Sequence, residues 1–390
     1  MPRLYDDSAL AVAAHVLTEG PISRADVARE LRLSGATLTR LVRPLVNAGL
    51  IDDRGVGTPQ TGVGRPTQLL EIPPAAHHFI GINVTSSAAH AALTNTCGQT
   101  LASEAVPLRD TDPYVVAGQI HEIVDSLAGQ QGFGREQLRG IGLSLGGQLS
   151  DGVVEDSRFL GWHNVDLLAL IGPVYGVPIS LRNDLVALTM LEQWFGLGRT
   201  HPSFVVTSVG SGIGHGVVHH SRAVAPIFGG HGTTSHIPLA GARGVCQYGH
   251  IGCANGALTS RAVLARAHAG RYIIADDSRP DSLDDLVALA HDGDLSCQNT
   301  IAEFSRNLAT YMQTVCGAAM TTDAVLDGEA VALLGTPWAS GFDESLSCFH
   351  SPKLPQLRIH RRSGSFDRWA RGAAVTAIVA WLETQVEAAR

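Results

Sequence analysis

The sequence is poor in several features that would each assign it to a particular class of protein. Of its 28 basic residues only Lys353 is a lysine, a bias that we attribute to genome composition rather than to chemistry. Its six cysteines are too sparse and irregularly spaced for the disulfide framework of a small secreted domain. No apolar run approaches the roughly 20 residues that a membrane-spanning helix needs. The apolar stretch that starts at Ala9 lacks the basic start of a signal peptide. We therefore expect a cytoplasmic protein.

Charge is distributed unevenly along the 390 residues, whose number suggests two or three domains. The net charge of −8 argues against a protein that coats nucleic acid with its whole surface. Residues 1–74 are neutral, with eight Arg against eight Asp or Glu, so the remainder carries the entire −8. Within residues 23–47, however, five Arg stand against two acidic side chains, a local charge of +3. The sequence therefore allows one small basic surface near its start.

Three short helices are predicted in the first 50 residues. An apolar periodic segment ends at Gly20-Pro21, a pair that stops a helix. Ser23 and Ser34 stand where helix-capping hydroxyls are expected for the second and third helices. Apolar residues recur every three or four positions in the third helix, although Pro44 within it should kink it. Two short helices joined by a tight turn predict a helix-turn-helix.

The face of the third helix opposite its apolar stripe carries small and basic side chains. Such a face fits the major groove, where Arg can reach a guanine edge or a phosphate. The sequence next predicts a two-stranded wing, from Leu50-Ile51 and residues 69–72. An Arg held between Gly and Pro at the end of its loop suits a narrow minor groove. A helix-turn-helix used only for dimerisation is the alternative. The DNA contacts expected are Ser34, Ala36, Thr37, Thr39, Arg40, Arg43 and Arg65.

From His78 onward the pattern changes to alternating strands and helices. Strand-like apolar runs alternate with segments of helical periodicity, such as residues 115–127 and 186–195. This alternation predicts an α/β architecture with more than one sheet. The glycine-rich run Gly210-Ser211-Gly212-Ile213-Gly214 follows a strand and suits either a bound phosphate or the reversal of a hairpin.

Two motifs farther along the chain are more specific. One is the loop Gly229-Gly230-His231-Gly232-Thr233-Thr234-Ser235-His236, and the other is Cys246-Gln247-Tyr248-Gly249-His250-Ile251-Gly252-Cys253. Together with the helix-turn-helix they resemble the ROK family (repressors, open reading frames and kinases), in particular its winged-helix regulators. The resemblance covers nearly the whole chain. It implies a winged helix-turn-helix DNA-binding domain at 1–74 and a ROK sugar-kinase-like domain at 75–390.

The resemblance also implies the fold of the second domain. It should be the two-lobed, actin-like (ribonuclease H-like ATPase) fold of sugar kinases. Lobe one would comprise about 78–185 plus a C-terminal helix at about 366–390, and lobe two would comprise about 186–365.

A structural zinc site is implied by the resemblance, with one departure. The family's motif C-x-C-G-x-x-G-C-x-E binds zinc together with an upstream His. His236, Cys246 and Cys253 match, but Tyr248 replaces the middle cysteine. A closed zinc site normally has four ligands. Either His250 supplies the fourth from a position that the family does not use, or the loop is held by packing without a metal.

A sugar pocket with altered acceptors is implied as well. In the family's kinases an Asn-Asp pair binds sugar hydroxyls and the Asp is the general base. Asn183-Asp184 matches this pair, although such a pair can also merely cap a helix. Leu160-Gly161-Trp162 resembles another signature near the sugar. Two family glutamates are Thr233 and Asn255 here, which favours a different, weaker or more acidic ligand than glucose. The implied effector contacts are Trp162, Asn183, Asp184, Thr233, His236 and Asn255.

The phosphate-binding elements of the family's kinases are changed in this sequence. Their D-x-G-G-T loop corresponds to Asn83-Val84-Thr85-Ser86-Ser87, which lacks the metal-holding aspartate and both glycines. A later glycine pair is reduced to Asp327-Gly328. We therefore expect neither ATP nor Mg²⁺ as a cofactor and no catalytic residue, with Asp184 a vestigial general base.

These features favour a DNA-binding transcriptional regulator, expected to be a repressor. Its partners would be a double-stranded DNA operator and a small-molecule sugar or sugar-derived effector, and it would form a homodimer or homotetramer. Two alternatives remain open at this point. One is a sugar kinase with an appended DNA-binding head, and the other is a DNA-binding regulator that responds to no ligand.

Overall fold

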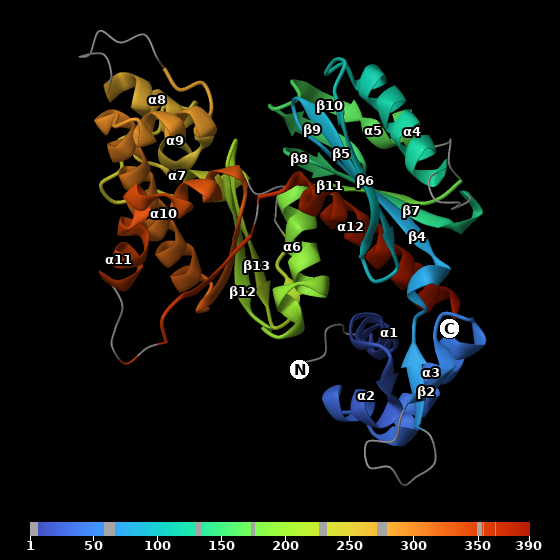
Figure 1. Cartoon of the computed structure of the whole chain (residues 1–390). Coiled ribbons are helices and arrows are strands. Elements are labelled where there is room, and N and C mark those ends of the chain that lie inside the picture. Colours follow the sequence, from blue (N-terminus) through green and yellow to red (C-terminus); the bar gives the residue numbers. More distant parts are fainter. Residues whose placement is uncertain are drawn as a thin grey trace.

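The computed structural model describes residues 7–57, 67–129, 135–172, 176–225, 232–270, 279–348, 353, 355–362 and 364–390. Figure 1 shows a small N-terminal head and two larger lobes, each lobe built around a five-stranded sheet. Two helices, α6 (Asp184–Phe195) and α12 (Phe366–Ala388), pack against each other between the two sheets. The predicted fold class, a winged head followed by a two-lobed α/β body, is confirmed.

The head contains the three predicted helices and a small sheet of strand order β1-β3-β2. Its elements are α1 (Ser8–Glu19), β1 (Ile22–Ser23), α2 (Arg24–Glu30), α3 (Gly35–Asn47), β2 (Asp52–Gly57) and β3 (Thr67–Glu71). The Ser23 hydroxyl accepts a hydrogen bond from the Asp26 N–H at 3.1 Å, and Ser34 caps α3 through the Thr37 N–H at 3.1 Å. These hydrogen bonds confirm the predicted capping of both helices. Pro44 does not end α3, which continues to Asn47.

The first strand of the wing begins later than predicted. Leu50 and Ile51, expected within it, are buried in the core of the head, and the N–H groups of both bind the Leu45 carbonyl. The extended strand begins only at Asp52, because the preceding apolar pair closes the helical core instead. The predicted wing tip with Arg65 lies outside the described residues.

The sheet of lobe one has the strand order β11-β7-β4-β5-β6. Its strands are β4 (His78–Val84), β5 (Ala88–Asn95), β6 (Thr100–Pro107), β7 (Leu138–Leu145) and β11 (Ile179–Asn183). α4 (Pro113–Gly129) covers one face and α12 the other. A Cβ at Gly142 would lie 1.7 Å from the Ala373 carbonyl oxygen, so this glycine lets α12 approach the sheet. A smaller sheet with α5 completes the lobe: β8 (Gln148–Ser150), β9 (Val153–Ser157), β10 (Trp162–Asp166) and α5 (Leu167–Ile171).

The sheet of lobe two has the strand order β14-β13-β12-β15-β16. Its strands are β12 (Phe204–Val209), β13 (Ile213–His219), β14 (Arg222–Ala223), β15 (Asp323–Asp327) and β16 (Arg358–Arg361). The helices are α7 (Ala254–Leu258), α8 (Ser260–Gly270), α9 (Leu283–His291), α10 (Leu295–Ala318) and α11 (Gly341–Cys348). α10 supplies much of the core on one face of this sheet, and α6 packs on the other. Within the described ranges no helix combines the length and apolarity that crossing a membrane requires.

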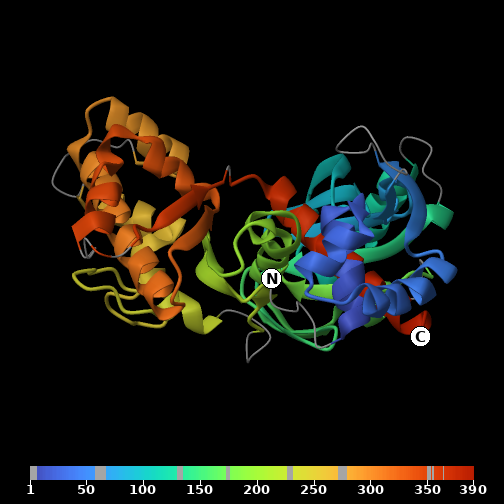
Figure 2. The same ribbon diagram turned by 90° about the horizontal axis from the view of Figure 1, so that it is seen from below.

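One hydrophobic cluster extends from the head into the body. It includes Val12 of α1, Leu188 of α6 and Leu382 of α12. Figure 2 shows the head lying against lobe one and the end of α12, away from the helices of lobe two. Only a short 3₁₀ turn, η1 (Pro74–Ala76), joins the head to the first strand of the body. The head is therefore packed on the body through α1 and α12.

Candidate functional site

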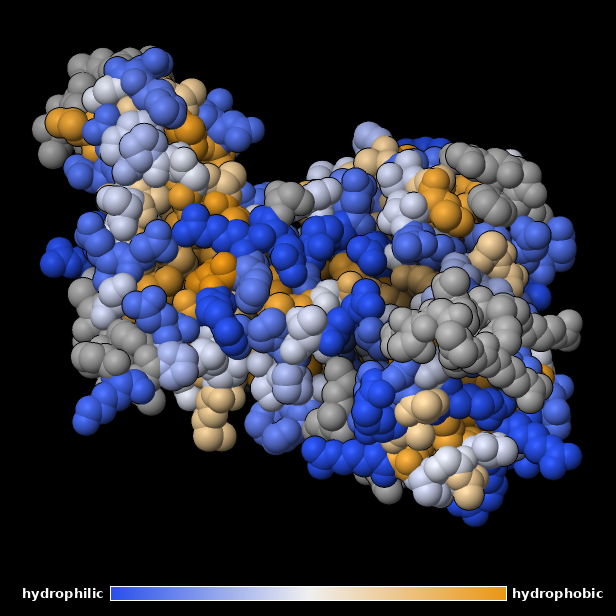
Figure 3. Space-filling view, turned by 60° about the horizontal axis from the view of Figure 1, so that its bottom comes forward, coloured by the Kyte–Doolittle hydropathy of each residue, from blue (hydrophilic) through white to orange (hydrophobic). Residues whose placement is uncertain are grey.

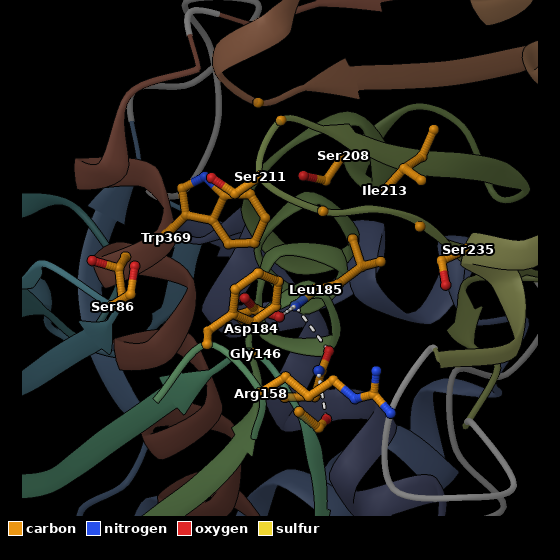
Figure 4. Close-up of a pocket in the computed structure, with 18 of the residues that line it drawn as sticks. Ser86, Gly146, Arg158, Asp184, Leu185, Ser208, Ser211, Ile213, Ser235 and Trp369 are labelled. Atoms are coloured by element: carbon orange, nitrogen blue, oxygen red, sulfur yellow. Dashed lines mark hydrogen bonds between the residues drawn. The ribbon is translucent and has the colours of Figure 1, made fainter. Parts of the chain in front are cut away.

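A cavity of about 420 Å³ lies between the lobes, where strand ends of the two sheets face each other (Figure 4). Its volume is within the range of small-molecule binding sites. Lobe one contributes the segments that follow β4, β7 and β11, while lobe two contributes the turn between β12 and β13 and the start of α7. The cavity wall includes many residues of the motifs singled out in the sequence, among them Asn83, Asn183, Asp184, His236 and Asn255.

Asn183 and Asp184 stand at the end of β11 and the start of α6. The Asn183 side chain accepts hydrogen bonds from the N–H groups of Leu185 and Val186, at 3.0 and 3.3 Å, and donates one to the Gly147 carbonyl. It thus caps the helix, the alternative that the sequence left open. Burial raises the pKa of Asp184 to about 6. The cavity wall therefore contains a carboxyl group that can accept a hydroxyl hydrogen bond when ionised and donate one when protonated.

The turn after β4, which corresponds to the family's phosphate loop, is closed by its own hydrogen bonds. The Thr85 hydroxyl oxygen accepts from the N–H groups of Ser87 and Ala88 at 3.3 and 3.1 Å, and the Thr85 N–H binds the Ala88 carbonyl. Asn83 donates its amide hydrogen to the Ser144 hydroxyl at 3.0 Å. Two backbone N–H groups of this turn are thus engaged by a side chain that a glycine would lack.

The glycine-rich run at 210–214 reverses the chain between β12 and β13, one of its two predicted roles. Gly210 donates its N–H to the Gly212 carbonyl at 2.8 Å. The Glu329 carboxylate lies beside this turn and accepts hydrogen bonds from the hydroxyls of Ser211 at 3.2 Å and Ser260 at 2.7 Å. A carboxylate in this position repels an approaching phosphate.

Four possible metal ligands converge at the lobe-two side of the cavity. The donor atoms of His236, Cys246, His250 and Cys253 all lie within 4.8 Å of one another. The His236 Nδ1 is 3.3 Å from the His250 Nδ1 and 3.6 Å from the Cys253 sulfur. Two thiols and two imidazoles are a ligand set that tetrahedral zinc uses. His250 thus occupies a fourth position even though Tyr248 has replaced the family's cysteine.

The two thiols of this cluster differ, because the pKa of Cys246 is lowered while burial raises the pKa of Cys253. Burial also opposes the ionisation of Cys246, but hydrogen bonds from the backbone N–H groups of Tyr248 and His250 lower the pKa of Cys246 below its ordinary value. Burial and the neighbouring His250 and Arg158 lower the pKa of His236, which favours the neutral imidazole. A thiolate and a neutral imidazole are the protonation states that ligate a metal.

Tyr248 also connects the two lobes across the cavity. The guanidinium carbon of Arg158, from the segment between β9 and β10, lies 4.0 Å from the centre of the Tyr248 ring. Such a cation–π contact contributes about 0.5–1 kcal/mol at an exposed site. Arg158 and the neighbouring Phe159 both line the cavity, and sequence analysis missed them. Their position directly before the Leu160-Gly161-Trp162 signature was the available signal.

Two predicted effector contacts are not placed at the cavity by the structure. Trp162 is buried in lobe one, where its indole N–H donates to the Thr111 carbonyl, and it does not line the cavity. Its ring is needed for the core beneath the small sheet, so Phe159 faces the cavity instead, with 48% of its surface exposed. The side chain of Thr233 lies outside the described part of the chain.

The predicted DNA-reading face of α3 is accessible. Ala36, Thr39, Arg40 and Arg43 are exposed, while Leu38 and Val42 point into the core of the head. Arg29 and Arg24 of α2 pair with Asp26 and Asp53, whereas among the described residues neither Arg40 nor Arg43 forms an ion pair. Figure 3 brings this end of the molecule forward and shows hydrophilic side chains over much of it. α3 therefore presents two uncompensated positive charges.

Comparisons with known proteins agree on one family. The sequence profile of the ROK family matches residues 79–335. The xylose repressor of Caldicellulosiruptor bescii is 23% identical over 309 residues, which cover 77% of each chain. A transcriptional regulator of Mycobacterium tuberculosis is 25% identical over 340 residues, covering 84% of this chain and 76% of that protein.

Solved structures share the fold. The crystal structure of a ROK family transcriptional regulator, a homologue of the Escherichia coli Mlc protein, superposes with a TM-score of 0.76 at 21% identity, covering 97% of this chain and 98% of that one. A ROK family glucokinase from Streptomyces griseus, in complex with glucose and AMPPNP, gives a TM-score of 0.63 at 18% identity and covers 76% of this chain and 98% of its own. The fold is therefore common to regulators and kinases.

Proposed function

This chain belongs to the ROK family, and from that premise we propose that it is a DNA-binding transcriptional repressor controlled by a sugar or sugar-derived effector. The observation that carries the proposal is the combination of a capped helix-turn-helix with an interlobe cavity in one packed molecule. The matched xylose repressor, a curated relative over 77% of this chain, supports a sugar as the chemical class of the effector.

Operator recognition is assigned to the exposed face of α3. Arg40 and Arg43 carry the uncompensated charges of that face, so they provide contacts to guanine or phosphate. Ser34, Ala36, Thr37 and Thr39 have side chains small enough to let the helix enter the major groove. A second copy of the chain supplies the second half-site, because a helix-turn-helix reads DNA best as a dimer.

Effector binding is assigned to the interlobe cavity. Asp184 and Asn255 offer acceptors for sugar hydroxyls, and Phe159 offers an apolar surface on which a sugar ring can pack. Arg158 and His236 add a positive and a hydrogen-bonding group to the cavity lining, which suits a sugar derivative that carries an acidic group.

Two helices provide the route from the cavity to the head. α6 begins at the cavity with Asp184, and the turn after it reaches α1 through an ion pair between Arg199 and Glu19. α12 begins with Phe366, which lines the cavity, and the end of the chain after it pairs with Asp7 of the head. A ligand that favours one arrangement of the lobes therefore changes how both helices meet the head.

A buried charge network ties these helices to lobe two. Glu192 of α6 is only 1% exposed and accepts hydrogen bonds from Arg362 at 2.9 Å and from Arg368 of α12. Arg368 also donates to Asp327, at the end of β15, at 2.8 Å. Because the Glu192 and Asp327 carboxylates are buried, separating them from the two arginines would be costly, so this network links α6 and α12 to lobe two.

Phosphoryl transfer is the second candidate, since Asp184 is retained and the fold matches a glucokinase. Against it stand the closed turn at Thr85 and the Glu329 carboxylate beside the glycine-rich turn. We therefore propose that the chain has no ATP-dependent kinase activity and needs no Mg²⁺. We also propose that His236, Cys246, His250 and Cys253 hold a structural zinc ion, which would fix the loop that carries Tyr248.

A thermal-shift panel of sugars, sugar acids, sugar phosphates and ATP with Mg²⁺ tests the effector assignment. A ligand at about 100 times its dissociation constant stabilises the protein by about 2.7 kcal/mol, which is readily detected. Stabilisation by a sugar compound but not by ATP is expected. A shift with ATP, together with turnover, would favour the kinase, and no shift with any compound would favour a regulator that needs no ligand.

A further inference from the structure

We propose that His201, Asp323 and His360 form a second metal-binding site, for Zn²⁺ or a similar divalent transition metal. The site is distinct from the Cys-His cluster at the cavity and does not depend on the proposed function. Its three side chains come from three separate segments: the turn before β12, the first residue of β15, and β16. Their possible ligand atoms lie within 4.8 Å of one another.

The strand register brings two of the three ligands onto one face of the sheet. β15 and β16 run parallel, with Asp323 opposite Arg358 and Val325 opposite His360. Because side chains alternate between the faces of a strand, Asp323, Val325 and His360 share a face. Val325 packs in the cluster that contains α6, so this is the face turned toward α6 and the head. His201 reaches the same place from the turn after α6.

The distances suit a tetrahedral metal better than they suit hydrogen bonds. The Nε2 atoms of His201 and His360 lie 3.5 and 3.6 Å from the Asp323 Oδ1, longer than an ordinary hydrogen bond. Ligand atoms about 2.1 Å from a tetrahedral zinc are separated from each other by about 3.4 Å. The His360 Nε2 is shielded from solvent and has no hydrogen-bond partner among the described residues. A cation between the three atoms would satisfy it.

Neighbouring groups orient the ligands. The Nδ1 of His201 is 2.8 Å from the Thr200 hydroxyl, a contact that leaves Nε2 free to bind a metal. Arg358 donates to both oxygens of Asp323 at 2.7 Å and fixes the carboxylate plane. A carboxylate has about four lone pairs, so Oδ1 retains one that faces the imidazoles. The positive charge of Arg358 weakens the binding of a cation at this site. Its two hydrogen bonds, however, orient the Asp323 carboxylate and keep it ionised, as a ligand must be.

Metal binding here would fix a segment next to the head. His201 is two residues beyond Arg199, whose guanidinium pairs with Glu19 of α1. The metal would join this turn to β15 and β16. These two parallel strands run toward the cavity, so the site, near their starts, lies at the end of the sheet remote from the cavity.

The test is the zinc stoichiometry of the full chain without a histidine tag, stripped with a chelator and equilibrated with Zn²⁺. Wild type should bind one equivalent more than the His201→Gln/His360→Gln variant. A His219→Gln/His220→Gln variant, which alters two exposed histidines near the same sheet, should bind as much as wild type. Equal zinc contents in wild type and the His201→Gln/His360→Gln variant would overturn the proposal.

A second measurement keeps the test independent of the cluster at the cavity and of folding defects. In a Cys246→Ser/Cys253→Ser variant, Co²⁺ should still bind and give the visible absorption of nitrogen and oxygen ligands, without a thiolate charge-transfer band. Adding His360→Gln to that variant should abolish this absorption. If the Cys246→Ser/Cys253→Ser variant binds no Co²⁺ although its melting is cooperative, the second site does not exist.

Discussion

Arg199 forms a two-pronged ion pair with Glu19 of the DNA-binding head, with nitrogen–oxygen distances of 3.2 and 3.1 Å. Arg199 lies in η5 (Leu197–Arg199), directly after the helix that starts at the interlobe cavity. The pair is partly exposed, so its own contribution to stability is at most about 1 kcal/mol. The pair matters because it joins the turn after α6, a helix that starts at the cavity, to α1 of the head.

Replacement of Arg199 by Ala should weaken communication rather than folding. We expect the melting temperature to change by only a few degrees and operator affinity without effector to stay within about fivefold of wild type, since about 1 kcal/mol corresponds to that factor. The effector-induced change in operator affinity should decrease. Fluorescence anisotropy with and without effector measures both quantities.

The matched control for this variant is Arg109→Ala, because Arg109 forms a comparable exposed ion pair with Glu122 in lobe one. That variant should respond to the effector like wild type. An unchanged response in Arg199→Ala, or an equal loss in Arg109→Ala, would show that the pair between Arg199 and Glu19 carries no signal.

Arg40→Ala and Arg43→Ala should each weaken operator binding. Loss of a contact to a guanine edge costs about 1–3 kcal/mol of discrimination, whereas loss of a phosphate contact reduces the slope of log affinity against log salt concentration by about one. Titrations at several salt concentrations distinguish the two roles. Arg29→Ala, in the same head but paired with Asp26, is the control and should bind nearly as wild type. A variant of Arg40 or Arg43 that binds like wild type at every salt concentration contradicts that residue's assignment.

The pH dependence of stability should report Asp184. Its folded pKa of about 6 exceeds the unfolded value near 4, so its contribution to stability is fully present below pH 4 and is lost as the pH rises toward 6. The loss corresponds to as much as about 3 kcal/mol. In denaturant titrations Asp184→Asn should therefore gain stability over wild type between pH 4 and pH 7.

The same Asp184→Asn variant should bind the effector less tightly while its effector-free operator binding remains intact. A constant stability difference from wild type across this pH range would mean that Asp184 does not titrate as the structure implies. Loss of operator binding would instead assign Asp184 a structural role.

Glu192→Gln should be strongly destabilising. The neutral amide removes the buried counter-charge of Arg362 and one of the two carboxylates that pair with Arg368, and breaking such a buried pair costs about 3–5 kcal/mol. Glu122→Gln, at an exposed pair, should change the free energy of unfolding by less than about 1 kcal/mol. Chemical denaturation compares the two variants, and similar values for both would contradict the described network.

Local patterns in the sequence were sufficient for the head. Hydroxyl caps and apolar spacing act within one turn of a helix, so Ser23 and Ser34 could be interpreted without knowing the fold. Leu50 and Ile51 look like a strand by composition, but the core of the head needs both, and tertiary packing overrides local propensity.

The site could be predicted only in part, because its remaining features depend on contacts between distant segments. Glu192 and Arg362 are 170 residues apart, and no local pattern indicates their pairing. The approach of His250 to His236 likewise depends on how the loop folds. Trp162 shows the opposite case, since the family signature implied a place near the sugar while the core of lobe one holds the ring.

Control of operator binding by a sugar is tested by selecting operator DNA from a random pool with the full-length protein and titrating the enriched sequence with sugars and sugar derivatives. We predict an enriched sequence with two related half-sites about 10 base pairs, or a multiple of that, apart, and release by one class of sugar compound. Failure to enrich any sequence would contradict a DNA-binding regulator. Enrichment of a site that no sugar compound weakens would contradict control by a sugar bound in the cavity.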